Sequence, residues 1–140
     1  MHSRKMMTAY QNAEKDAVAE SEDPHGLIAV LFDELVRTMR AYVAGVKESP
    51  TKEVNDSGQF SRAMTILYGL QSSLNFDEGG EIAENLFKLY EYARQQLLET
   101  ARTRKVEHIT TAIDAIETIR DAWHQIEQPQ EVEGKNLAAE

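Results

Sequence analysis

The sequence predicts an all-α protein, an antiparallel up-down four-helix bundle with a mobile N-terminal segment. In four stretches, apolar residues recur at steps of three and four, which is the helical period. The 3 Pro and 7 Gly fall mainly at the edges of these stretches, and no stretch reads as a convincing strand. We therefore expect a mobile segment at residues 1–22, the bundle at residues 23–127 and a disordered tail at residues 128–140.

The first predicted helix begins at Asp23-Pro24, because Asp is a good N-cap and Pro is favoured at the first helical position. It ends at Glu48-Ser49-Pro50. Its apolar stripe consists of Leu27, Ile28, Val30, Leu31, Phe32, Leu35, Val36, Met39, Tyr42, Val43 and Val46. This stripe is wider than a surface helix of a plain monomeric bundle needs. The width favours a groove that accepts another helix.

The second predicted helix starts near residues 55–57, where Asp56 and Gln59 resemble a capping box. Its stripe consists of Phe60, Ala63, Met64, Leu67, Leu70 and Leu74. Residues 75–80 form a turn-rich break, in which Gly79-Gly80 is read as a tight turn with helix capping.

The third and fourth predicted helices cover about residues 81–101 and 105–127. The stripe of the third consists of Ile82, Leu86, Leu89, Tyr90, Ala93 and Leu97. The stripe of the fourth consists of Val106, Ile109, Ala112, Ile113, Ile116, Ile119, Trp123 and Ile126. Because the connection between them is very short, these helices should be antiparallel neighbours.

Composition and charge argue against several classes of partner. Lys plus Arg is 15 and Asp plus Glu is 24, so the net charge is −9. Nucleic-acid and anionic membrane partners are therefore not expected. The absence of Cys excludes a disulfide scaffold and a thiol nucleophile. No apolar run approaches the roughly 20 residues that span a bilayer, and no secretory signal follows Met1, so we expect a cytoplasmic protein without membrane insertion.

The sequence gives no positive support for catalysis. Helical bundles with di-iron sites need inward-facing Glu-x-x-His pairs, but the interior stripes contain no carboxylate. Asp121 and His124 have a similar spacing, yet solvated side chains are the simpler interpretation. A phosphotransfer bundle needs an exposed His followed by small or basic residues, and neither His108 nor His25 fits. Both are interpreted as surface histidines. We expect no enzyme activity, no cofactor and no metal.

Residues 74–92 carry a resemblance to a known family, through the run Leu74-Asn75-Phe76-Asp77-Glu78-Gly79-Gly80-Glu81-Ile82-Ala83-Glu84-Asn85-Leu86 and then Leu89-Tyr90-Glu91-Tyr92. This run resembles the signature of the flagellar export chaperone family FliS. Residues 9–12, residues 24–28 and Trp123 agree with it, so the resemblance covers about residues 9–124. Two departures are a long stretch before Pro24 and Phe32 where the family often has Tyr.

The resemblance implies a cytoplasmic chaperone that binds the disordered C-terminal region of flagellin one-to-one. Binding would block premature polymerisation and keep flagellin competent for the flagellar type III export apparatus, a further partner. The implied partner-binding residues are Tyr10, Leu27, Ile28, Leu31, Phe32, Leu35, Leu67, Leu70, Leu74, Leu86, Leu89 and Tyr90, on the first three helices. Tyr10 would hold the N-terminal segment over this surface in the free protein. The alternative is a helical scaffold or adaptor for another amphipathic helix, and self-association stays open.

Overall fold

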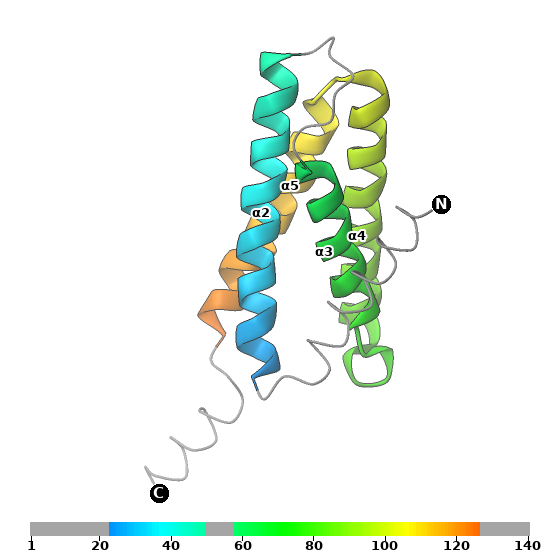
Figure 1. Ribbon diagram of the computed structural model, residues 1–140. Helices are drawn as coiled ribbons and strands as arrows, with labels where there is room; N and C mark the ends of the chain where they lie inside the picture. Colours follow the sequence, from blue (N-terminus) through cyan, green and yellow to red (C-terminus); the bar gives the residue numbers. More distant parts are fainter. Residues whose placement is uncertain (1–22, 50–57, 127–140) are drawn as a thin grey trace, which may run out of the picture.

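The computed structural model describes residues 23–49 and 58–126, and these form four helices without a strand. The helices are α2 (Pro24–Glu48), α3 (Gln59–Ser72), α4 (Phe76–Thr103) and α5 (Glu107–Gln125). Consecutive helices run in opposite directions (Figure 1). The predicted all-α bundle is confirmed. The expectations for residues 1–22 and for the tail at 128–140 lie outside the described residues.

Each helix packs against two others in a closed ring. α2 packs on α3 and α5, and α4 packs on the same two helices. The pairs across the diagonal, α2 with α4 and α3 with α5, make no backbone contact. This is the up-down arrangement that short connections favour.

The core lies along the axis of this ring. Its largest fully buried side chains are Phe32, Leu35, Met39, Tyr42, Val46, Ile66, Leu67, Leu70, Leu97, Ile109, Ile113 and Ile116. The wide apolar stripe of α2 is mostly covered inside the bundle, because this helix packs against two neighbours. Val36 and Val43 are buried, whereas Val30 is 60% exposed on the outside. The width of the stripe therefore does not by itself indicate a partner.

The helix ends follow local capping chemistry. As predicted, Asp23 caps α2, and its carboxylate accepts a hydrogen bond of 2.9 Å from the Gly26 amide. The predicted start of the second helix near residues 55–57, with Asp56 of its capping box, lies outside the described residues. Among the described residues, α3 begins at Gln59, after Gly58 with a φ of 82°.

The segment predicted as a break before the third helix is largely helical. Asn75 caps α4 by accepting a hydrogen bond of 3.0 Å from the Glu78 amide. One turn, Phe76–Gly79, follows, and then Gly80 interrupts the helix with φ 49° and ψ −124°. This backbone conformation suits glycine, because a Cβ makes it costly. α4 thus consists of a short first turn and a long body joined at Gly80.

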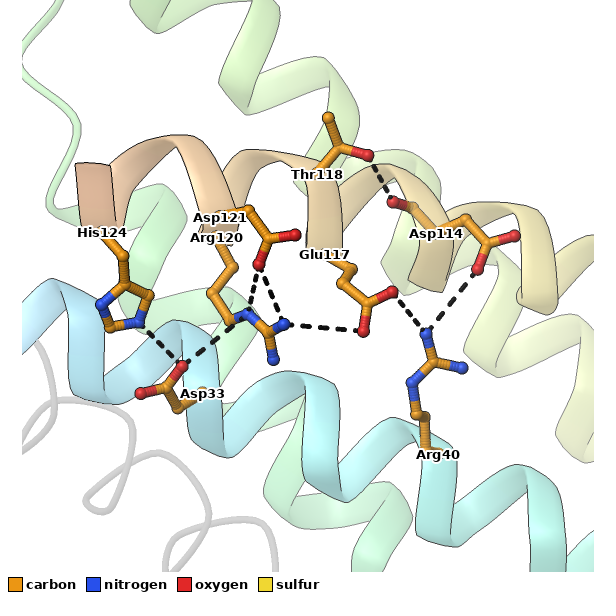
Figure 2. A network of polar contacts seen from close by, with 8 residues as sticks. All are labelled: Asp33, Arg40, Asp114, Glu117, Thr118, Arg120, Asp121 and His124. Carbon is orange, nitrogen blue, oxygen red and sulfur yellow. Dashed lines mark hydrogen bonds and ion pairs between the residues drawn. The ribbon is translucent and has the colours of Figure 1, made fainter. Parts of the chain in front are cut away.

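Polar side chains bridge α2 and α5 along their outer edge (Figure 2). Arg40 on α2 pairs with Glu117 at 2.9 Å, and Asp33 contacts His124 at 2.9 Å and Arg120 at 3.8 Å. We call this row of polar contacts between α2 and α5 the seam. Exposed ion pairs each contribute about 0.2–1 kcal/mol, so the seam orients α5 more than it stabilises the fold. It directs the charged side chains of α5 toward α2.

Candidate partner-binding groove

An apolar cavity of about 340 Å³ opens at the end of the bundle where α2 begins and α5 ends. All four helices contribute to it. Its lining consists of Ile28, Phe32, Leu70, Ser73, Leu74, Asn75, Glu78, Gly79, Ile82, Ala83, Leu86, Tyr90, Ile119 and Trp123. We call it the end cavity. Glu78 is the only Asp, Glu, Lys or Arg in this lining.

The end cavity exists because the core face of α4 loses its cover toward the start of the helix. Ile82, Leu86, Ala93 and Leu97 follow one another at helical spacing on this face. Ala93 and Leu97 are 0% exposed, Leu86 is half-buried, and Ile82 is 71% exposed. The same apolar stripe is therefore core at one end of α4 and uncovered surface at the other.

The last turns of α5 form the opposite wall, and Trp123 is fixed there by three contacts. Its Nε1–H donates a hydrogen bond of 2.9 Å to the carbonyl oxygen of His25. Its ring stacks on the His25 imidazole at a centroid distance of 4.6 Å and meets the Phe32 ring edge-on at 6.1 Å. The indole thus lies between the first turn of α2 and the cavity.

His25 itself is half-buried, so its interpretation as a surface histidine is wrong. Its Nε2 is buried and has no hydrogen-bond partner among the described residues. The stack on Trp123 explains the burial, because the first turn of α2 lies directly against the end of α5. His108, by contrast, is exposed as predicted.

The floor of the end cavity is apolar and held by core packing. The rings of Phe32 and Tyr90 are 6.4 Å apart, and both side chains are buried. Burial raises the pKa of the Tyr90 phenol, so this hydroxyl stays neutral. The Ser73 hydroxyl donates to the carbonyl oxygen of Leu70 at 3.0 Å. The floor therefore offers apolar contact and no charge.

The sequence-predicted contact residues fall into three groups. Tyr10 lies outside the described residues. Half-buried are Leu27, Ile28, Leu74, Leu86 and Leu89. Buried are Leu31, Phe32, Leu35, Leu67, Leu70 and Tyr90. The end cavity brings together Ile28, Phe32, Leu70, Leu74, Leu86 and Tyr90, whereas Leu35 and Leu67 lie in the closed core at 0% exposure.

The end cavity also has lining residues that are not among the predicted contacts, namely Ile119 and Trp123 on α5 and Ile82 on α4. Ile126 at the end of α5 is 52% exposed. All four had been placed on apolar stripes by their spacing. The spacing shows which face of a helix is apolar, but not where the neighbouring helix ceases to cover that face.

No group of three or more His, Asp or Glu side chains in residues 23–49 and 58–126 could hold a metal ion. The Asp121 and His124 pair instead joins the seam with α2, where Asp121 contacts Arg120 at 2.9 Å (Figure 2). Within the same ranges, no helix has the length and hydropathy to cross a bilayer.

Comparison with known proteins decides the family. A sequence model of the family described as "Flagellar protein FliS" matches residues 6–130. The chain belongs to the FliS family. The flagellar secretion chaperone FliS of Salmonella typhimurium is 31% identical over 132 residues, which cover 90% of this chain and 93% of that protein.

Two further FliS relatives match at similar coverage. The flagellar secretion chaperone FliS of Vibrio cholerae is 25% identical over 125 residues, covering 88% of this chain and 89% of that protein. The flagellar secretion chaperone FliSB of Pseudomonas aeruginosa is 29% identical over 128 residues, covering 90% and 98%. The chain is thus a helical bundle of a chaperone family that acts in flagellum biogenesis.

Proposed function

We propose that this FliS-family chain is a cytoplasmic chaperone that binds the disordered C-terminal region of flagellin. One chain would hold one flagellin, prevent premature polymerisation and keep the flagellin ready for the flagellar type III export apparatus. The observation that carries the proposal is the uncovered core stripe of α4 in the end cavity, where Ile82 is 71% exposed. The protein would act by binding alone, without a chemical step.

The physical chemistry of such a client requires this kind of surface. A disordered segment that folds on binding loses conformational entropy, so it must bury a large apolar area in return. The end cavity offers apolar contact for part of such a segment on two walls, Ile82 and Leu86 on α4 and Trp123 on α5. A client helix lying between these walls would replace the cover that the stripe of α4 lacks.

The proposed contact surface is narrower than the set predicted from sequence. The half-buried residues would touch a client directly, and these are Leu27, Ile28, Leu74, Leu86 and Leu89. Phe32, Leu70 and Tyr90 would form the floor beneath it. Leu31, Leu35 and Leu67 would be reached only if the bundle opened, because they are buried and do not line the end cavity.

The N-terminal segment is proposed to compete with the client for this surface through Tyr10. This segment joins α2 at Asp23, close to the end cavity that Ile28 lines. We expect Tyr10→Ala to change the affinity for the client, measured by calorimetry on the full chain. Tyr10→Phe serves as the control that keeps the ring. An affinity unchanged by Tyr10→Ala would contradict this role.

The test of the proposed function is calorimetric titration of the full chain with a peptide from the C-terminal region of the flagellin of the same organism. We expect one-to-one binding, a negative heat-capacity change and a gain of helicity by circular dichroism. An intact helical chain that does not bind the peptide would contradict the proposal and favour an adaptor for another amphipathic helix.

A further inference from the structure

We infer that the segment filling the end cavity is an amphipathic helix that carries Lys or Arg beside its apolar face. This inference rests on the proposed function and adds the chemistry by which the client is selected. It follows from the distribution of charge around the cavity.

Carboxylates outnumber Lys and Arg in the segments of α2, α3 and α4 that line the end cavity. Residues 23–36 contain no Lys or Arg, but His25 lies there, and Asp33 and Glu34 already pair with basic side chains. Residues 63–87 likewise contain no Lys or Arg, but they include the exposed acids Asp77, Glu78, Glu81 and Glu84. The lining residue among these, Glu78, therefore faces the cavity mouth without a nearby cation on its own helix.

The acids at the start of α4 are not neutralised by ion pairs. Within the described part of the chain, no ion pair reaches Asp77, Glu78, Glu81 or Glu84. The first basic residue of α4 is Lys88, ten residues after Glu78 and four after Glu84. Lys88 is therefore about 15 Å from Glu78 along a helix, beyond the Debye length of about 8 Å at physiological salt, whereas it is close enough to attract Glu84.

The one Lys or Arg at the end of α5 is already engaged elsewhere. Arg120 contacts Asp33, Glu117 and Asp121 in the seam with α2 (Figure 2). On the other edge of the α5 stripe, Ala115, Thr118 and Ala122 follow at helical spacing and carry no charge. The cavity thus lies between an acidic edge on α4 and a neutral edge on α5.

The difference in charge between the α4 edge and the α5 edge predicts which charge the occupant carries. The helix dipole partly stabilises Asp77 and Glu78 in the first turn of α4, and Glu81 at the start of the helix body after Gly80. Glu78 nevertheless lines the cavity without a cation beside it on the helix. An apolar cavity with negatively charged carboxylates near its mouth attracts a cationic partner and repels an anionic one. The occupant should therefore place Lys or Arg along α4, while its apolar face enters the cavity.

The test uses two designed peptides of about 18 residues, which form about five helical turns. Both have the same Leu and Ala face and lack Trp, and one has Lys where the other has Glu along one flank. The emission of Trp123, the only Trp of the chain, reports binding to the cavity. We expect the Lys peptide to bind about tenfold more tightly at low salt, as a few exposed charge pairs provide. The preference should shrink at about 300 mM salt.

Two double variants with equal charge change locate the effect. Glu78→Gln with Glu81→Gln should reduce the preference for the Lys peptide severalfold, because it removes the carboxylate that lines the cavity and a second one three residues further along α4. The matched control is Glu99→Gln with Glu107→Gln, at the opposite end of the bundle, and it should keep the preference. Circular dichroism of all variants checks that the bundle is intact.

The inference is contradicted if both peptides bind equally, if neither binds, or if the two double variants have the same effect. The flagellin peptide of the proposed function is titrated in parallel. Binding of that peptide without charge selectivity would leave the proposed function standing and remove the inference. Charge selectivity between the designed peptides without binding of the flagellin peptide would support the inference and contradict the proposed function.

Discussion

Ile82 and Leu97 show, at the scale of single residues, how one apolar stripe can serve two purposes. They lie on the same face of α4, yet Leu97 is 0% exposed and Ile82 is 71% exposed. Leu97 is surrounded by core residues, so its side chain contributes to stability. Ile82 lines the end cavity, where its side chain has little to contact in the free protein.

We therefore expect Leu97→Ala to lower the free energy of unfolding by about 3 kcal/mol, and Ile82→Ala to lower it by less than about 0.5 kcal/mol. Urea unfolding followed by circular dichroism measures both. Ile82→Ala should nevertheless weaken binding of the flagellin peptide at least about fivefold. Val30→Ala, an exposed aliphatic outside the cavity, is the control and should bind normally. A large loss of stability in Ile82→Ala would contradict this assignment.

Glu91 gives a residue-scale prediction about pH. Its carboxylate accepts hydrogen bonds from Arg94, Gln95 and Gln71, which lower its pKa from 4.5 to about 2. Since the pKa is lower in the folded state, the stabilisation is present above about pH 4.5 and is lost as the pH falls toward 2. The side chain is 37% exposed, so solvent screening limits the contribution to about 1 kcal/mol.

Glu91→Gln should thus destabilise the bundle at neutral pH and make little difference near pH 2. Urea unfolding of both proteins at about pH 7 and near pH 2 gives the comparison. Glu107→Gln, at an exposed acid in the first turn of α5, is the matched control. A difference between wild type and Glu91→Gln that is equal at both pH values would show that the hydrogen bonds do not depend on the charge.

At the scale of elements, α4 is defined by its interruption at Gly80. The first turn, Phe76–Gly79, contains no buried residue, and the ring of Phe76 contacts Phe87 at 6.0 Å on the outside. The body of the helix contributes Ala83, Tyr90, Ala93 and Leu97 to the interior. The kink lets Glu78 and Gly79 form part of the cavity wall instead of continuing the straight helix.

Gly80→Ala should destabilise the protein by about 1–3 kcal/mol, because a Cβ is unfavourable at a φ of 49°. Gly45→Ala is the contrasting variant in the same chain. Gly45 lies within α2 with ordinary helical geometry and open space around a Cβ, so Ala should stabilise by up to about 1 kcal/mol. Urea unfolding measures both. Equal effects of the two substitutions would contradict the role of the kink.

The elements also show what the sequence could and could not predict. Apolar periodicity found all four helices, and Asp23 was correctly predicted to cap the first. Residues 75–80 were predicted as a turn-rich break, because Asn and paired Gly are typical of turns. They instead contain the N-cap Asn75 and one helical turn that ends at Gly80.

At the scale of the whole molecule, the end cavity depends on where the four helices stop covering one another. A single sequence does not show this, so it cannot predict which apolar residues line the cavity. Six of the predicted contact residues line it, including Ile28 and Leu86. Trp123 and Ile119 line it as well, and periodicity could not indicate this because it treats every apolar residue of α5 as core. Leu35 and Leu67, two predicted contacts, lie in the closed core, because burial depends on neighbours that a single sequence does not reveal.

The central claim is that the client enters the end cavity between α4 and α5. The most direct test is the emission of Trp123 during titration with a flagellin C-terminal peptide that lacks Trp. The indole lies in the cavity wall and is the only one in the chain, so the signal has one source. We predict a blue shift that saturates at one peptide per chain. Binding by calorimetry with unchanged Trp123 emission would place the client elsewhere on the bundle and contradict the account.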